Sequence, residues 1–192
     1  MRVSRVQAEE NRQAVINTAS RLFRQHGFDG IGLKDVMEAA GLTQGGFYKQ
    51  FASKEDLAVQ ASARALETAT QRWSRAAAKN PRDSLGAVIA FYLSEGHRAE
   101  KSDGCPIVAL GSDVARQAPE VKAPFEAGIK AHLELLNRIV AEAGAKDSKA
   151  KALTILSMMV GTLTLARAVN DAGLAQALLK NAAKEVRKAA AA

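Results

Sequence analysis

Cysteine and proline are scarce in this chain of 192 residues, and each scarcity narrows the class of protein. A single cysteine, Cys105, excludes an internal disulfide framework and is typical of a reducing compartment, so we expect a cytoplasmic protein. Only four prolines interrupt the chain, and the abundant Ala, Leu, Glu, Lys and Arg favour helices. The predicted fold class is therefore all-α.

Long apolar runs and a leader peptide are also missing. The most apolar stretch, Leu153 to Val169, is interrupted by hydroxyl groups, a glycine and Arg167, which predicts a buried helix and no membrane span. Asn, Arg and Gln break up the region around Val15 and Ile16, which argues against a signal peptide. We expect no membrane partner.

Patterns that carry catalysis or bind metals are not found in the sequence either. His26, His97 and His132 have no metal-ligand spacing with one another or with Cys105. No glycine-rich phosphate loop follows a strand, and no catalytic triad can be discerned. The sequence therefore predicts no enzyme, no metal and no cofactor.

Positive charge is in excess, at +7, which invites a nucleic-acid partner. Residues 1–56, however, hold eight lysines and arginines against seven acids, so most of the excess lies in residues 57–192. The total charge therefore does not locate a DNA-binding face, and the placement of individual residues must do so.

Hydrophobic periodicity and helix stop signals divide the chain into nine predicted helices. Gly27 and Asn80-Pro81 are clear stops, and Ser53 with Asp56 forms an acidic variant of the capping box. The predicted ranges are Ala8–His26, Leu33–Ala40, Gln44–Phe51, Ser53–Lys79, Ser84–Lys101, Pro106–Gln117, Pro119–Ala143, Lys149–Asn170 and Leu174–Lys188.

The segment from Gly41 to Phe51 has the pattern of the turn and second helix of a helix-turn-helix. Gly41 can adopt the left-handed conformation that ends a helix, and Thr43 can cap the next helix. Phe47 and Phe51 are four residues apart and are predicted to anchor one face. The residues left on the other face are small, polar or cationic, as entry into a DNA groove requires: Gln44, Gly45, Tyr48 and Lys49.

A resemblance to the DNA-binding domain of TetR/AcrR-family transcriptional regulators is carried by Gly27-Phe28-Asp29-Gly30, Leu33-Lys34-Asp35-Val36, Gly41–Phe51 and Ser53–Leu57. The match is colinear over about residues 9–60. The resemblance implies an N-terminal three-helix helix-turn-helix domain, residues 1–56, and a larger C-terminal helical domain for effector binding and dimerisation, residues 57–192. Gly32 departs from the capping Thr or Ser of the family, so a hydroxyl that could contact phosphate is missing.

The chemistry of the predicted outer face suggests a role for each side chain. Tyr48 and Lys49 can bond phosphates through a hydroxyl and an ammonium group. Thr43 and the backbone N–H groups beside it can do the same. Gln44 can pair with adenine, and Gly45 permits close approach to a base.

Three further basic residues extend this predicted DNA contact. Lys54 resembles the phosphate-contacting lysine of the family. Arg2 and Arg5 are predicted on a flexible arm that can enter a minor groove. The alternative for Lys49, Lys54 and both arginines is an ordinary solvated surface charge.

Cys105 directly precedes Pro106, which suits the first position of a helix, so the cysteine is predicted to cap that helix. A helix N-terminus favours anions and activates thiols, and His97, Arg98 and Lys101 precede it closely. A sensing thiol and a buried small apolar side chain both remain open.

The family resemblance also implies a pocket for a small-molecule effector. Most residues that line such pockets are apolar or aromatic, with a few polar groups. The candidates, of which each aromatic residue can alternatively be plain core, are Trp73, Phe91, Tyr92, Glu95, Phe125, Ile129 and His132.

The last two predicted helices carry a stripe of small residues. Its members, all on the first of the two, are Ser157, Gly161, Thr164 and Ala168, while Leu178 and Ala182 lie on one face of the final helix. Periodicity alone does not distinguish a core within the chain from a contact with a second chain. The resemblance implies the second, a homodimer with a four-helix bundle, which would place two recognition helices on a palindrome of double-stranded DNA.

Together these features predict a ligand-responsive DNA-binding transcriptional regulator, a repressor that a small effector releases from a palindromic operator. The alternative is a helical ligand-binding or interaction protein without operator specificity. Salt-dependent binding to palindromic and to random DNA distinguishes the two.

Overall fold

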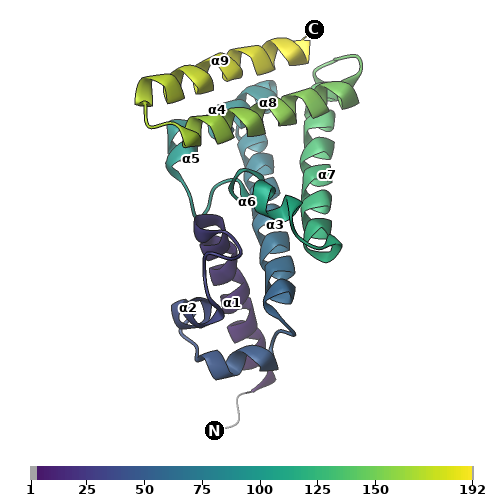
Figure 1. Cartoon of the computed structure of the whole chain (residues 1–192). Coiled ribbons are helices and arrows are strands. Elements are labelled where there is room, and N and C mark those ends of the chain that lie inside the picture. Colours follow the sequence, from purple (N-terminus) through teal and green to yellow (C-terminus); the bar gives the residue numbers. More distant parts are fainter. Residues whose placement is uncertain (1–3, 192) are drawn as a thin grey trace. The chain divides into compact units, whose positions relative to one another are not determined.

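The computed structural model describes residues 4–191, and no strand occurs among them, so the predicted all-α fold is confirmed. The helices are numbered in chain order, with η for 3-10 helices (Figure 1). Their bounds are α1 Arg5–His26, α2 Leu33–Ala39, η1 Gln44–Lys49, α3 Lys54–Lys79, η2 Pro81–Asp83, α4 Ser84–Tyr92, α5 Glu95–Ala99, α6 Pro106–Ala115, α7 Pro119–Glu142, α8 Ser148–Ala168 and α9 Ala172–Ala191.

The helices group into two compact units. The first comprises the residues up to Glu67 together with Lys101–Glu126, and the second comprises Thr68–Glu100 and the residues from Ala127 onward. The two long helices α3 and α7 each contribute to both units.

The first unit is built around apolar residues that recur at helical spacing. Val15, Ala19 and Phe23 of α1 are buried against Val36 and Met37 of α2. Residues of η1, of the first half of α3, of α6 and of the start of α7 complete the same core. Burial of these side chains is the main stabilising contribution, at about 1.5–3 kcal/mol for each large one.

Two glycines end the first two helices as predicted. Gly27 and Gly41 have φ values of 77° and 74°, the left-handed region that only glycine enters without strain. After α2, the N–H of Leu42 donates to the carbonyl of Met37 (2.9 Å) and the N–H of Gly41 to that of Glu38 (2.9 Å). This pair of bonds is a Schellman motif, which directs the chain into the turn before η1.

The N-terminal helix begins earlier than predicted. Ser4 is its N-cap, and the Ser4 hydroxyl accepts the N–H of Gln7 at 3.1 Å. Arg5 is therefore the first residue of α1 and does not lie on a flexible arm, which corrects that prediction. Arg2 lies outside the described residues.

The single helix predicted over Ser84–Lys101 is wrong, because the chain forms two helices there. The Ser94 hydroxyl donates to the carbonyl of Phe91 (2.8 Å), where α4 ends, and accepts the N–H of His97 (3.1 Å), where α5 begins. A serine that satisfies both helix ends makes a break more favourable than a continuous helix.

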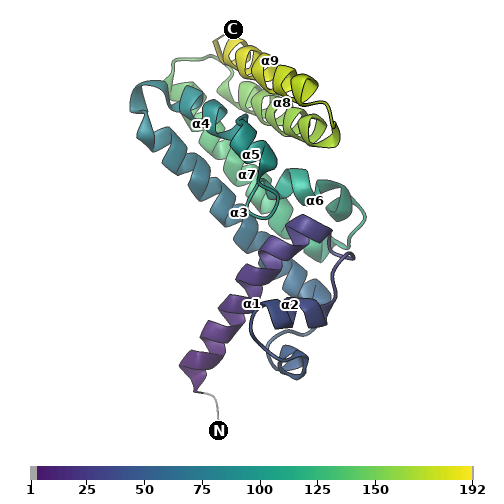
Figure 2. The same cartoon turned by 90° about the vertical axis from the view of Figure 1, so that its left-hand side faces the viewer.

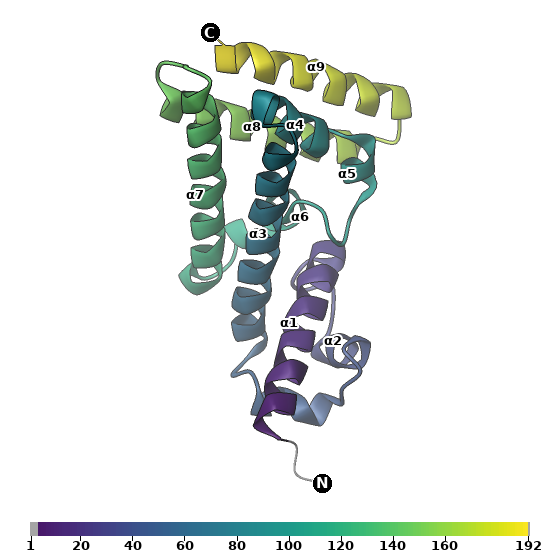
Figure 3. The ribbon, with the colours of Figure 1, turned by 180° about the vertical axis from the view of Figure 1, so that it is seen from behind.

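In the second unit, α8 and α9 lie side by side and antiparallel, joined by a short loop (Figure 2). α4 packs against α9, and α5 packs against α8 (Figure 3). By length and composition, α8 is the one helix among residues 4–191 that could cross a membrane. Core helices of soluble proteins pass the same test, and one face of α8 is buried in this unit.

Candidate nucleic-acid interface and effector-binding residues

The predicted recognition helix is shorter and tighter than an α-helix. Gln44–Lys49 is a 3-10 helix, in which the N–H of Gly46 donates to the carbonyl of Thr43 (3.0 Å). Adjacent glycines have poor α-helix propensity, which accounts for the difference from the predicted Gln44–Phe51 helix. Thr43 stands at the N-cap position, but its side chain makes no capping bond, contrary to the prediction.

Phe47 anchors this element in the core of the first unit. It is fully buried, and its ring stacks on that of Phe51 with centroids 5.4 Å apart. The ring of Tyr48 meets Phe47 edge-on at 5.1 Å, yet Tyr48 remains 73% exposed. The core therefore fixes one side of η1 while the Tyr48 hydroxyl is held toward solvent.

The remaining predicted groove-facing residues share this exposed side. A side chain added at Gly45 would meet nothing within 4 Å, so the backbone there is open to close approach by a ligand. No hydrogen bond or ion pair within residues 4–191 engages the Lys49 ammonium group. The residues classed as exposed are Thr43, Gln44, Gly45, Tyr48 and Lys49.

A chain of polar contacts ties α1 to the end of the recognition element. The Arg12 guanidinium lies 5.2 Å from the centroid of the Phe51 ring and donates to Gln60 Oε1 at 2.5 Å. Gln60 Nε2 in turn donates to Asp56 Oδ1 at 2.7 Å. Charge-assisted hydrogen bonds of this kind fix side-chain geometry more firmly than neutral ones.

Asp56 also completes the cap at the start of α3. Its Oδ2 accepts the N–H of Ala52 (3.0 Å), while its own N–H donates to Ser53 Oγ (3.1 Å). Half of the predicted acidic capping box is therefore present: Ser53 caps Asp56, but the carboxylate accepts the N–H of Ala52 in place of the N–H of Ser53 that the box requires. Lys54, the residue after Ser53, is the first residue of α3, and its side chain is half-exposed.

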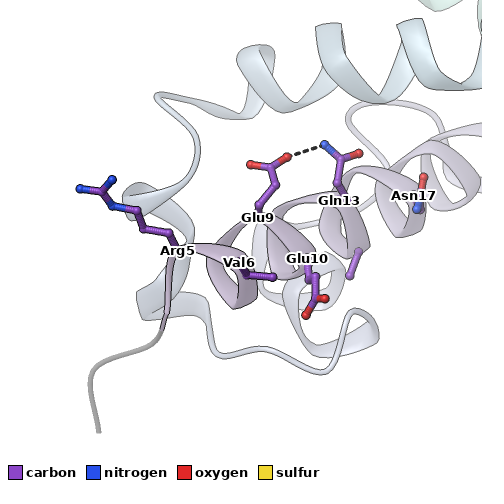
Figure 4. Close-up of a pocket in the computed structure, with 7 residues that line it drawn as sticks. Arg5, Val6, Glu9, Glu10, Gln13 and Asn17 are labelled. Atoms are coloured by element: carbon purple, nitrogen blue, oxygen red, sulfur yellow. Dashed lines mark hydrogen bonds between the residues drawn. The ribbon is translucent and has the colours of Figure 1, made fainter.

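Arg5 extends from the first turn of α1, at one end of a shallow hollow on the outer side of that helix (Figure 4). Val6, 69% exposed, is beside it, and farther along Gln13 Nε2 donates to Glu9 Oε1 at 2.9 Å. The helix, and not an arm, therefore fixes the position from which Arg5 can reach a ligand.

Three of the predicted effector-pocket residues come together in the second unit. The Trp73 ring meets Tyr92 edge-on with centroids 5.0 Å apart, and His132 with centroids 4.6 Å apart. All three side chains are buried. His132 Nδ1 lies 2.8 Å from the carbonyl of Gly128, which only accepts, so this nitrogen carries the proton.

Burial lowers the pKa of His132, and the hydrogen bond to Gly128 opposes that shift. The folded state therefore holds this side chain neutral at a pH where the unfolded state, with a pKa of about 6.5, takes up a proton. The neutral His132 side chain therefore contributes its full stabilisation when the pH is above the unfolded-state pKa of about 6.5. This stabilisation decreases as the pH falls below that value.

We expect the wild type to lose thermal stability between about pH 7.5 and 5.5 more steeply than the His132→Gln variant. Differential scanning calorimetry at constant ionic strength measures this. His26 is exposed, so His26→Gln is the matched control and should leave the slope unchanged. Equal slopes of thermal stability against pH for the wild type and His132→Gln would contradict the conclusion that His132 is held neutral in the folded state.

Phe91 joins the same cluster through His97, whose ring lies 5.3 Å from that of Phe91 and 4.8 Å from that of Tyr92 between centroids. The remaining predicted pocket residues are arranged differently, and Ile129 is half-buried. Glu95 is exposed and pairs with Arg98 at 2.5 Å, and that hydrogen bond lowers the pKa of the Glu95 carboxyl group. Phe125 belongs to the core of the first unit, whereas the other six candidates lie in the second.

Cys105 is the N-cap residue of α6, as predicted, and is buried, with 4% of its surface exposed. Its side chain does not cap the helix. The guanidinium of Arg24, itself buried, donates to the carbonyl of Gly104 at 3.1 Å, and Asp103 pairs with Arg21 at 2.6 Å. These bonds fasten the segment before Cys105 to α1.

The small residues of α8 face away from the core of the chain. A side chain at Gly161 would meet nothing within 4 Å, and Leu153 and Leu165 are each 56% exposed. The exposed members are Ser157, Gly161, Thr164 and Ala168. On α9, Leu178 is half-buried and Ala182 is buried in the chain itself, so Ala182 adds little to this exposed face.

Sequence reasoning missed the residues that fix the recognition element from a distance. Arg12 and Gln60 are 48 residues apart, and no local pattern pairs them.

A second set of contacts that was not predicted lies in the second unit. Arg167, near the end of α8, donates to the carbonyls of His97 and Glu100, both at 2.8 Å.

Two family profiles match the chain. Residues 15–61 match the bacterial regulatory proteins of the tetR family, and residues 81–185 match the C-terminal domain of LmrA/YxaF-like transcriptional regulators. The first match covers α2, η1 and the turn between them, and the second covers more than half of the chain.

Known proteins agree with this assignment. The HTH-type transcriptional regulator LmrA of Bacillus subtilis is 23% identical over 155 residues, 79% of this chain and 82% of the relative. The reduced form of Escherichia coli NemR has a similar fold, with a TM-score of 0.81 at 22% identity over 93% of this chain and 97% of that one. A TetR regulator from Chloroflexus aurantiacus gives a TM-score of 0.80 at 27% identity, over 94% and 96%. The chain belongs to the TetR family of ligand-responsive, DNA-binding transcriptional regulators.

Proposed function

We propose that this regulator is a repressor that binds a palindromic operator as a homodimer in the cytoplasm and leaves it when a small effector binds. The observation that carries the proposal is η1, which is anchored by buried Phe47 and presents Tyr48 and Lys49 to solvent. A short helix with one fixed face and one polar, cationic face suits the major groove.

Within this proposal the exposed residues divide by role. Tyr48, Lys49 and Thr43 contact phosphates, and Gln44 and Gly45 meet base edges. Arg5, at the start of α1, and Lys54, at the start of α3, add phosphate contacts. Arg5 precedes η1 in the chain and Lys54 follows it. Residues 1–56 act as the DNA-binding domain, and residues 57–192 provide effector binding and dimerisation.

The proposed dimer is formed by α8 and α9. Small exposed side chains permit close approach of two helices, and the exposed Leu153 and Leu165 would be covered by the partner chain. Effector binding, near Trp73, Tyr92 and His132, would favour a dimer geometry that no longer matches the spacing of the half-sites.

An electrophoretic mobility shift with the DNA upstream of the chain's own coding sequence tests this function. The expected result is a complex with that DNA that persists in the presence of a shuffled sequence of equal composition. Specific protein–DNA binding is typically tighter than non-specific binding by the same protein, by a factor of about 10³ or more. Equal competition by both DNAs would favour the alternative, a ligand-binding or interaction protein without operator specificity.

We also propose that Cys105 is a sensing thiol. Two observations support the proposal: Cys105 is the N-cap residue of α6, and the similar NemR structure is that of a reduced form. The expected result is that alkylation of Cys105 by iodoacetamide releases the operator, whereas Cys105→Ser binds DNA and no longer responds. Slow labelling without any change in DNA affinity would leave Cys105 as a buried apolar side chain.

A further inference from the structure

A groove with a cationic rim lies in the second unit, between the end of α3 and α4. Its volume is about 290 Å³. None of the predicted DNA contacts lies here, although part of the positive charge of residues 57–192 does. The lining residues are Arg72, Arg75, Ala76 and Lys79 of α3 with Ala87 and Phe91 of α4.

The cations of the groove exceed the acids that they contact. Arg72 pairs with Glu100 at 2.7 Å and lies 5.0 Å from the centroid of the Phe91 ring. Arg75 and Lys79 are exposed, and neither forms a hydrogen bond or an ion pair within residues 4–191. Two positive charges at the rim are therefore available to an anion.

The floor of the groove is apolar. Ala76 is buried, and Ala87 and Phe91 are half-buried. The Phe91 ring is held by its stacking on His97, at 5.3 Å and 23° between the planes, and by the Arg72 guanidinium, which lies over the ring. An aromatic surface in a fixed orientation favours a ligand that also carries an aromatic or aliphatic body.

We propose that this groove binds small carboxylic acids with an apolar body, such as arylalkanoates. The guanidinium of Arg75 can hold a carboxylate with two hydrogen bonds, and the Lys79 ammonium adds a point charge. The body of the acid packs on Phe91 and the two alanines. This binding needs neither DNA nor a second chain, so it is independent of the proposed operator function.

Isothermal titration calorimetry of the full chain with 4-phenylbutyrate and with its neutral amide, 4-phenylbutyramide, tests the proposal at constant ionic strength. We expect the acid to bind at least about tenfold more tightly than the amide, because only the acid gains charge-assisted hydrogen bonds. The double variant Arg75→Gln/Lys79→Gln should lower the affinity for the acid by a similar factor. Both residues are exposed, so this variant is expected to fold.

The matched control is Lys180→Gln/Lys184→Gln, which removes the same charge from exposed residues of α9 and should leave the affinity unchanged. Equal affinities for the acid and the amide would overturn the proposal, as would undiminished binding of the acid by Arg75→Gln/Lys79→Gln. An equal loss of affinity in the control variant would show that the effect comes from net charge alone, which would also overturn the proposal.

Discussion

Alanine at Tyr48 or at Lys49 is expected to weaken operator binding by about tenfold or more in each case, while the free energy of unfolding stays within about 0.5 kcal/mol of the wild type. Tyr48 is 73% exposed and Lys49 is exposed, so neither side chain contributes much to the core. Each occurs twice in a dimer on a palindrome, which doubles the free-energy cost of its loss.

Salt dependence separates the two variants. Lys49→Ala removes one phosphate contact in each half-site, so the slope of log affinity against log salt should fall by about two for the dimer. Tyr48→Ala removes a neutral hydrogen bond and should leave that slope nearly unchanged. Fluorescence anisotropy at several salt concentrations measures both quantities. Lys122→Ala, an exposed lysine of α7, is the matched control. Wild-type affinity in both variants would refute the assignment of η1.

Leucine at Gly161 is expected to dissociate the homodimer. In a single chain this residue has open space around it, so the substitution should not harm the monomer, and replacing a glycine within a helix favours it by about 0.5–1 kcal/mol. Against a partner helix the same side chain would overfill a close contact, at a cost of about 1–3 kcal/mol for each copy. The substitution should therefore stabilise the folded monomer and destabilise the dimer.

Sedimentation equilibrium and thermal unfolding together test the dimer face. The variant should be monomeric at concentrations where the wild type is a dimer, and it should bind the operator only weakly because one half-site is lost. Gly111→Leu, at another glycine of a helix with open space around it, is the control and should remain dimeric. A dimeric Gly161→Leu would place the interface elsewhere.

Local patterns predicted the parts of the fold that local chemistry determines. Gly27 and Gly41 end their helices as expected, because their left-handed conformation suits glycine alone. Phe47 and Phe51 face the core as expected from their spacing. The exposure of Tyr48 follows from the same helical spacing, so most of the candidate DNA face could be predicted from the sequence.

Features that depend on contacts between distant residues could not be predicted. The bond from Arg12 to Gln60 joins positions 48 residues apart, and the periodicity of each helix is satisfied without it. The face that the small residues of α8 present was also ambiguous, because both sides of α8 contain apolar residues. The split of α4 from α5 depends on the two bonds of one serine, Ser94, which resembles any other polar residue in an amphipathic pattern.

Hydroxyl-radical footprinting of the wild-type protein on the DNA upstream of its own coding sequence tests most directly that paired η1 elements read an operator. The predicted result is two related patches of protection whose centres are about 34–36 Å, one turn of DNA, or a multiple of it apart. Protection should disappear from both patches with Lys49→Ala. A single patch, or uniform protection that persists in this variant, would contradict the account.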